Sequence, residues 1–182
     1  MDIKTFPLAI ESPILEEIQI LMEAHNAATA GTKMFKNSRK TECSQFIWEN
    51  INSREDLMGL TIFYDDNNIY INYPIFKLFV IPEIYDIIMD YIIRIIVELI
   101  NKNGKYNIHV NIDGFTISAA ERYMGIINTV FERVFRTEYV HYLEKIYIYN
   151  APSVIDFLKN IFQGLIRGNS VLMGKFALIG KN

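Results

Sequence analysis

The run from Ile84 to Ile100 constrains the fold more than any other part of this sequence, because it is nearly all Ile, Tyr, Val, Leu and Met. Its charged residues recur at every fourth position: Asp86, Asp90, Arg94 and Glu98. On a helix this spacing forms one line, in which Arg94 can pair with Asp90 and with Glu98. Each charge would cost about 2.5–3.5 kcal/mol near the centre of a bilayer, so a membrane span is excluded. We therefore expect a helix over 83–101 that is largely buried against a sheet.

Short runs of β-branched and aromatic residues alternate with helical segments along the rest of the chain. "LTIFY" (60–64) and "IYINY" (69–73) flank an Asp-Asp-Asn-Asn turn and predict a hairpin, and turn chemistry explains the paired aspartates better than a metal site does. A capping box formed by Ser118 and Glu121 begins a further helix. The remaining strands and helices are expected over 107–112, 118–138, 145–150, 153–167 and 175–179. This alternation predicts an α/β fold with a mixed, mostly parallel sheet and crossover helices.

The first part of the chain predicts helices without strands. One helix is expected over 12–28, a polar loop over 29–40, and a short helix over 43–51. We therefore predict a short N-terminal helical segment over 1–57, followed by the α/β domain over 58–182.

Composition and charge narrow the classes of function. The chain has 182 residues, of which 51% are hydrophobic, so it has ample material for a core. Its formal net charge of -3 gives no general attraction to nucleic acid. The single cysteine, Cys43, excludes an internal disulfide, and because no signal peptide stands at the start, a reducing, cytoplasmic location is expected.

The residue types needed for covalent catalysis do not gather in the sequence. His25, His109 and His141 lack metal-ligand spacing, and His109, inside a predicted strand, is expected to be a hydrogen-bonded sheet residue. "IDGFTIS" resembles neither a serine nucleophile elbow nor a phosphate-binding loop. We therefore expect no enzyme, no metal and no cofactor. Two interpretations remain: a binding module for an apolar molecule, or a scaffold or interaction domain.

The segment 153–167, "SVIDFLKNIFQGLIR", has almost no polar face, although it follows a strand behind a stiff Asn150-Ala151-Pro152 corner. It carries more apolar residues than one core-facing stripe needs. A helix that faces an apolar ligand on one side and a membrane on the other has this character. A helix packed between the sheet and a partner chain has it as well.

Three stretches of the chain resemble the CRAL-TRIO lipid-binding family, which includes phosphatidylinositol transfer proteins. "VNIDGFTISAAERYM" (110–124) is similar to the central strand, glycine corner and following helix of that family. "YVHYLEKIYIYNAP" (139–152) resembles its tyrosine-led run into a strand that ends on Asn-Ala-Pro. "GKFALIG" (174–180) is similar to its lysine-led strand after the gate helix. The resemblance covers roughly 58–182.

The resemblance implies a sheet beneath an apolar pocket, closed over one lipid by a gate helix that falls on 153–167. It implies lipid transfer or presentation at a membrane surface, with no nucleic acid as partner and with a protein partner as a further possibility. Lys175 and His141 are the expected headgroup contacts. The expected pocket residues are Ile108, Val110, Phe157, Leu158, Ile161, Phe162 and Phe176. The alternative is a scaffold on the same fold with a filled pocket.

Overall fold

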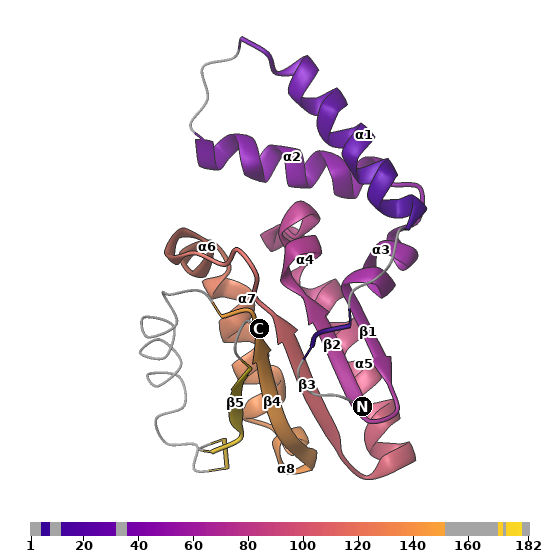
Figure 1. The fold of residues 1–182 in the computed structure, drawn as a ribbon, viewed down its shortest axis with the longest axis vertical. Coiled ribbons are helices and arrows are strands. Elements are labelled where there is room, and N and C mark those ends of the chain that lie inside the picture. Colours follow the sequence, from indigo (N-terminus) through magenta and orange to yellow (C-terminus); the bar gives the residue numbers. More distant parts are fainter. Residues whose placement is uncertain (1–4, 8–11, 32–35, 152–170, 173, 180–182) are drawn as a thin grey trace.

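A five-stranded mixed sheet forms the centre of the molecule (Figure 1). The computed structural model describes residues 5–7, 12–31, 36–151, 171–172 and 174–179. Within them the strands lie in the order of the chain: β1 (Ile62–Asp65), β2 (Asn68–Asn72), β3 (Tyr106–Asn111), β4 (Leu143–Tyr149) and β5 (Phe176–Ile179). β1 is antiparallel to β2, and each later strand is parallel to its neighbour. The predicted α/β class with a mixed, mostly parallel sheet is confirmed.

The main crossover helices that the structure describes, α5 (Tyr85–Asn103) and α7 (Met124–Val130), pack on one face of this sheet. The β2-to-β3 crossover is α5, preceded by α4 (Tyr73–Phe79) and the 3-10 turn η1 (Pro82–Ile84). The β3-to-β4 crossover consists of α6 (Ile117–Arg122), α7, the π-helical turn η2 (Phe131–Phe135) and α8 (Tyr139–Tyr142). Side chains of α5 and α7 meet the same aliphatic face of the strands, and α5 and α7 contact each other. This placement agrees with right-handed parallel crossovers.

Helix α5 confirms the predicted helix, but it is less buried than expected. One face is fully buried, through Ile88, Met89 and Ile96, yet Ile87 on the opposite side is 51% exposed, so the helix covers the sheet and is not enclosed. Gly104 ends the helix at φ 71°, where its N–H donates to the carbonyl of Ile100 at 2.8 Å. Only glycine adopts this left-handed cap without a steric penalty.

The predicted pairing along the charged line of α5 is wrong. Asp90 pairs with Arg133 of η2 at 2.6 Å, and Glu98 accepts a hydrogen bond from the Tyr64 hydroxyl at 2.9 Å. Arg94 lies instead over the ring of Tyr91, 5.1 Å from its centroid. Neighbouring elements thus supply better-placed partners than the next turn of the same helix.

The predicted single helix over 118–138 is broken into several pieces, and its predicted cap is displaced. Thr116, not Ser118, is the N-cap: its hydroxyl accepts from the N–H of Ala119 at 3.2 Å, while Ser118 lies inside the helix. Both residues precede an apolar run, so the sequence pattern alone did not separate them. After α7 the backbone widens into η2, where the N–H of Arg136 reaches the carbonyl of Phe131 at 2.9 Å.

Three further boundaries differ from expectation. α3 (Arg54–Thr61) replaces the expected start of the first strand, because Ser53 caps it by accepting from the N–H of Asp56 at 3.1 Å. α4 begins at Tyr73, expected to be a strand residue, because Pro74 suits the first turn of a helix. α2 (Lys36–Asn50) begins within the expected polar loop.

The N-terminal helices join the same hydrophobic core as the sheet. α1 (Pro13–Ala28) packs on α2, which packs on α4 (Figure 1). Trp48 of α2 stacks on Phe79 of α4, with centroids 5.8 Å apart. The predicted domain boundary between residues 57 and 58 falls inside α3. That boundary stays a prediction. Among the described helices, none has the length and apolar character needed to cross a membrane.

Candidate ligand cavity

The two faces of the sheet carry different chemistry because side chains alternate along each strand. The face toward α5 and α7 is aliphatic and includes Ile69, Ile71, Ile108, Val110, Ile146 and Ile148. The opposite face carries aromatic and amide side chains, including Tyr70, Asn72, His109, Asn111, Tyr147 and Tyr149. Each face therefore requires its own explanation.

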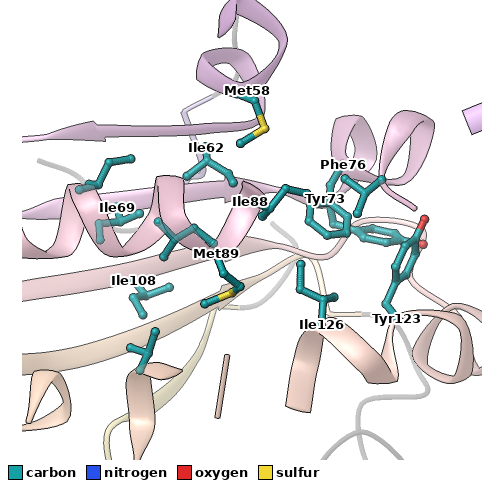
Figure 2. Close-up of a cluster of buried hydrophobic side chains, with 14 of the residues drawn as sticks. Met58, Ile62, Ile69, Tyr73, Phe76, Ile88, Met89, Ile108, Tyr123 and Ile126 are labelled. Atoms are coloured by element: carbon teal, nitrogen blue, oxygen red, sulfur yellow. The ribbon is translucent and has the colours of Figure 1, made fainter. Parts of the chain in front are cut away.

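A cavity of about 210 Å³ lies between the aliphatic face and the crossover helices. As far as the described residues form it, its wall is apolar and comes from strands β2 to β5, α4, α5, α7, η2 and the segment after β3. Figure 2 shows a cluster of buried hydrophobic side chains that includes part of this wall. Ile108, Tyr73, Tyr123 and Ile126 are the labelled residues that illustrate it. Protein interiors are normally close-packed, and an apolar cavity of about 150 Å³ already admits benzene. The cavity is thus large enough to hold an apolar molecule.

The structure places the predicted pocket residues in two groups. Ile108, Val110 and Phe176 line the cavity. The other predicted pocket residues lie outside the described residues: Phe157, Leu158, Ile161 and Phe162. Their assignment to the pocket, like the gate helix over 153–167, stays a prediction.

The π-helical turn η2 builds one wall of the cavity. Phe131, Val134 and Phe135 all line it, and the two phenylalanine rings meet edge to face at 5.1 Å. A π turn inserts an extra residue into the helical repeat and is frequent at functional sites. The sequence pattern predicted one continuous helix over this segment and not the widened turn.

The expected headgroup residues, Lys175 and His141, do not line the cavity. The Lys175 ammonium donates to the backbone carbonyls of Val140, at 3.0 Å, and of Leu143. Burial is the main cause that lowers the pKa of Lys175. His141 is exposed on α8. Lys175 therefore holds the α8–β4 junction to the start of β5, and the structure gives neither residue a place on the cavity wall.

Polar and cationic groups gather instead at the end of the cavity formed by Tyr73 and Tyr123. The Tyr123 hydroxyl donates to the backbone carbonyl of Lys77 at 3.4 Å, and the Lys77 ammonium lies 5.6 Å from the centroid of the Tyr73 ring. The charge of Arg122 acts on both Tyr123 and Tyr73. Burial nevertheless raises the pKa of Tyr73 to about 12, so its phenol stays protonated. Sequence reasoning missed this cluster because its two halves, one on α4 and one at the α6–α7 junction, lie far apart along the chain.

On the opposite face, four aromatic rings form a row across four strands, two of its three contacts being stacked. The row runs Phe63, Tyr70, His109, Tyr147, with successive centroids 5.0, 4.8 and 4.6 Å apart. These distances match the spacing of neighbouring strands. Residues 5–7 lie across this face (Figure 1), where the Phe6 ring meets Phe63, Tyr70 and Tyr149 edge to face.

His109 has a partner at each ring nitrogen, which confirms that it is a hydrogen-bonded sheet residue. Nε2 lies 3.1 Å from Asn68 Oδ1, which also accepts from the Asn107 amide, so Nε2 carries the proton. Nδ1 then accepts from the Tyr149 hydroxyl at 2.8 Å. Burial lowers the pKa of His109 to about 4 and raises that of Tyr149 to about 12. Both groups are therefore neutral at pH 7, which suits a structural network.

An asparagine ladder, formed by Asn72, Asn111 and Asn150, joins the carboxyl ends of β2, β3 and β4. Asn111 donates to Asn72 Oδ1 at 3.1 Å and accepts from the Asn150 amide at 2.9 Å. Asn150 has φ 55°, a left-handed conformation that asparagine tolerates. Each interval in the ladder is 39 residues, and this equal spacing is the sequence signal that was overlooked.

The described residues contain no cluster of three or more His, Cys, Asp or Glu side chains that could hold a metal ion. Asp65 and Asp66 lie at the β1–β2 turn, as turn chemistry predicted, with Asp66 at φ 55°. Cys43 is half-buried, and burial raises the pKa of its thiol.

The fold and the site thus define an α/β protein with a five-stranded mixed sheet, whose helix-covered face borders an apolar cavity. Comparison of the chain with protein-family models, with curated proteins and with solved structures found no match.

Proposed function

We propose that this protein binds one hydrophobic ligand, a lipid or lipid-like molecule, in the cavity between the sheet and its crossover helices. It would transfer or present this ligand at a membrane surface in the cytoplasm, without covalent catalysis. The observation that carries the proposal is the 210 Å³ cavity, whose wall is apolar wherever described residues form it.

The driving force is the removal of hydrocarbon from water, at about 25 cal/mol per Å² of apolar surface. Pockets for drug-sized ligands usually measure about 300–1,000 Å³, so the cavity of 210 Å³ fits a single chain better than a two-chain lipid. The best candidates are therefore single-chain lipids and other slender apolar molecules.

A CRAL-TRIO-like fold is part of this proposal. Strands β2 to β5 are parallel and lie in sequence order, and the described crossover helices α5 and α7 share one face. β3 and β4 coincide with the stretches that resemble that family. Closure by the 153–167 segment remains an expectation from the sequence.

A second candidate is a scaffold or protein-interaction module with a filled pocket. Two exposed apolar side chains favour it: Ile87 on α5, 51% exposed, and Leu178 on β5, 46% exposed. In this case a partner protein, and not a lipid, would account for the apolar surface.

Extraction of the purified protein followed by lipid mass spectrometry separates the two candidates. We expect one lipid per chain, and we expect the fluorescent apolar probe N-phenyl-1-naphthylamine to bind at a site from which that lipid displaces it. Val130→Phe should abolish probe binding, because Val130 lines the cavity and the larger ring fills it.

Val97→Phe is the matched control, since Val97 is an exposed helical valine on α5 that does not line the cavity. It should leave probe binding unchanged. A protein that stays free of lipid after incubation with mixed liposomes, and that binds no probe, would contradict the proposed function.

A further inference from the structure

We propose that the cavity is a slot of fixed depth that selects its ligand by chain length. It takes one unbranched hydrocarbon chain of about ten to twelve carbons, which enters at the carboxyl ends of the strands and stops at a floor formed by Leu99, Tyr106 and Leu143. The inference rests on the proposed function. It adds the class of chain and the residues that select it.

The strand register places the lining residues at successive levels. Ile108 of β3 pairs with Ile146 of β4, and Val110 lies one level further along β3. Ile112 lies at the next level, where its N–H still donates to the carbonyl of Tyr149 at 3.1 Å. From Ile108 to Ile112 the backbone rises by about 13 Å, at about 3.3 Å per residue. The cavity therefore extends along the strands over a distance that suits an extended chain.

The burial of the wall shows which end of the cavity approaches the surface. On β3 and the segment after it, Ile108 is buried, whereas Val110 and Ile112 are half-buried. α7 and η2 lead back from the carboxyl end of β3 to the amino end of β4, and there Val130 is half-buried whereas Phe135 is buried. Two separate elements thus agree that the approach lies at the carboxyl ends of the strands, where open α/β sheets usually bind ligands.

The polar end of a ligand belongs at this same end. The described wall offers no polar surface, so a polar group cannot be satisfied inside the cavity. Figure 2 shows Tyr73 and Tyr123 at one end of the buried cluster and Ile108 nearer the other. The half-buried Phe115 ring meets the Tyr73 ring there, with centroids 4.8 Å apart. The hydrocarbon tail therefore points toward the amino ends of the strands.

Three fully buried side chains from different elements lie beneath the lining residues at the amino ends. Leu99 of α5, Tyr106 of β3 and Leu143 of β4 belong to the same hydrophobic cluster as the wall, and each is at most 2% exposed. Tyr106 pairs with Leu143 one level below Ile108. The Tyr106 hydroxyl donates to the backbone carbonyl of Tyr139 at 3.1 Å, which fixes the ring. These side chains form a packed floor.

A packed floor makes affinity depend on chain length in two regimes. Each carbon that enters the cavity should raise the affinity about 4-fold, because it removes one CH₂ group from water. A chain that already reaches the floor gains nothing from further carbons, since a close-packed interior does not yield without cost. Affinity should therefore rise with length and then level off.

The test measures the binding of even-numbered alkanoates, from octanoate to hexadecanoate, to the full chain by isothermal titration calorimetry. All are used at pH 8 and below the concentrations at which they form micelles, so only the length of the tail differs. We expect the affinity to rise about 15-fold for each two carbons up to about ten to twelve carbons. Beyond that length it should change by no more than about 2-fold per step.

Two substitutions should move this limit in opposite directions. Leu143→Ala lowers the floor and should shift the limit to chains about two carbons longer. Val134→Phe fills the lower part of the cavity, because Val134 is a buried lining residue of η2, and should shift the limit to shorter chains while octanoate still binds. Val134→Phe also decides the question if Leu143→Ala does not fold.

Leu57→Ala is the matched control for the truncated leucine. Leu57 of α3 is fully buried in the same cluster but packs near β1 and β2 and does not line the cavity. This variant should lose stability and keep the length limit of the wild type.

An affinity that keeps rising up to hexadecanoate would overturn the inference, as would a limit that stays in place in both Leu143→Ala and Val134→Phe. The proposed function survives either result if Val130→Phe abolishes alkanoate binding. If no alkanoate binds but N-phenyl-1-naphthylamine does, the inference alone falls. If neither binds, the inference and the proposed function fall together.

Discussion

Acid should destabilise this protein through His109, because the imidazole is buried in its neutral form. Its pKa falls from an ordinary 6.5 in the unfolded chain to about 4 in the folded protein. The unfolded chain therefore takes up the proton first, so the stability is complete above pH 6.5 and is lost as the pH falls toward 4. The fall in pKa corresponds to about 3 kcal/mol in total, most of which is lost by pH 4.5. This loss is a large share of a typical stability of about 5–15 kcal/mol.

The assay is urea unfolding, followed by circular dichroism at several values between pH 7.5 and 4.5. Carboxylates also contribute to the pH dependence, so the informative quantity is the difference between the wild type and His109→Gln. Glutamine keeps a donor and an acceptor but does not titrate. The variant should lose about 2–3 kcal/mol less than the wild type over this range.

His141→Gln is the matched control, because His141 is exposed on α8. It should show the pH dependence of the wild type. Identical pH dependence in His109→Gln and the wild type would refute the reasoning, and so would an NMR titration that placed the midpoint of His109 near 6.5.

Three further outcomes follow from described contacts and can be measured by the same unfolding assay. Thr116→Ala should cost about 1 kcal/mol through loss of the N-cap, whereas Ser118→Ala should be nearly neutral; the reverse order would restore the capping box expected from the sequence. Asn111→Ala should lower the free energy of unfolding by about 2–3 kcal/mol, because it leaves the side-chain amides of Asn72 and Asn150 without this partner. An unchanged free energy would show that the ladder does not stabilise the fold. Phe6→Ala should cost about 3 kcal/mol, and an unchanged midpoint would show that Phe6 does not stabilise the aromatic face.

The sheet could be predicted from the sequence because its signals are local. Alternation over 60–73, the turn at Asp66 and the long apolar helix ending at Gly104 each fix the backbone within a few residues. Helices α3 and α4 were missed because they lie directly against the hairpin strands, where apolar residues satisfy either pattern. Only the cap of Ser53 and the placement of Pro74 separate the two, and each is a single-residue signal beside a much longer apolar pattern.

The site was harder to predict, for a reason that concerns distance along the chain. Ile108, Val110 and Phe176 line the cavity because the alternation in their strands points them to the helix-covered face. The cluster of Lys77, Arg122 and the tyrosines depends on contacts between residues more than 30 positions apart, which no local pattern reveals. The same applies to Lys175, whose carbonyl partners were invisible in the sequence.

The asparagine ladder also describes how the chain advances. Two successive returns to the carboxyl edge take the same 39 residues, although one passes through the long helix α5 and the other through a broken, π-widened one. Over these two turns the chain gains one strand every 39 residues, whereas the next return, from Tyr149 of β4 to its partner Ile179 of β5, takes only 30. The ladder is formed at the strand ends and not by the helices. A crossover can therefore bend around a cavity as long as it returns its asparagine to the carboxyl end of the sheet.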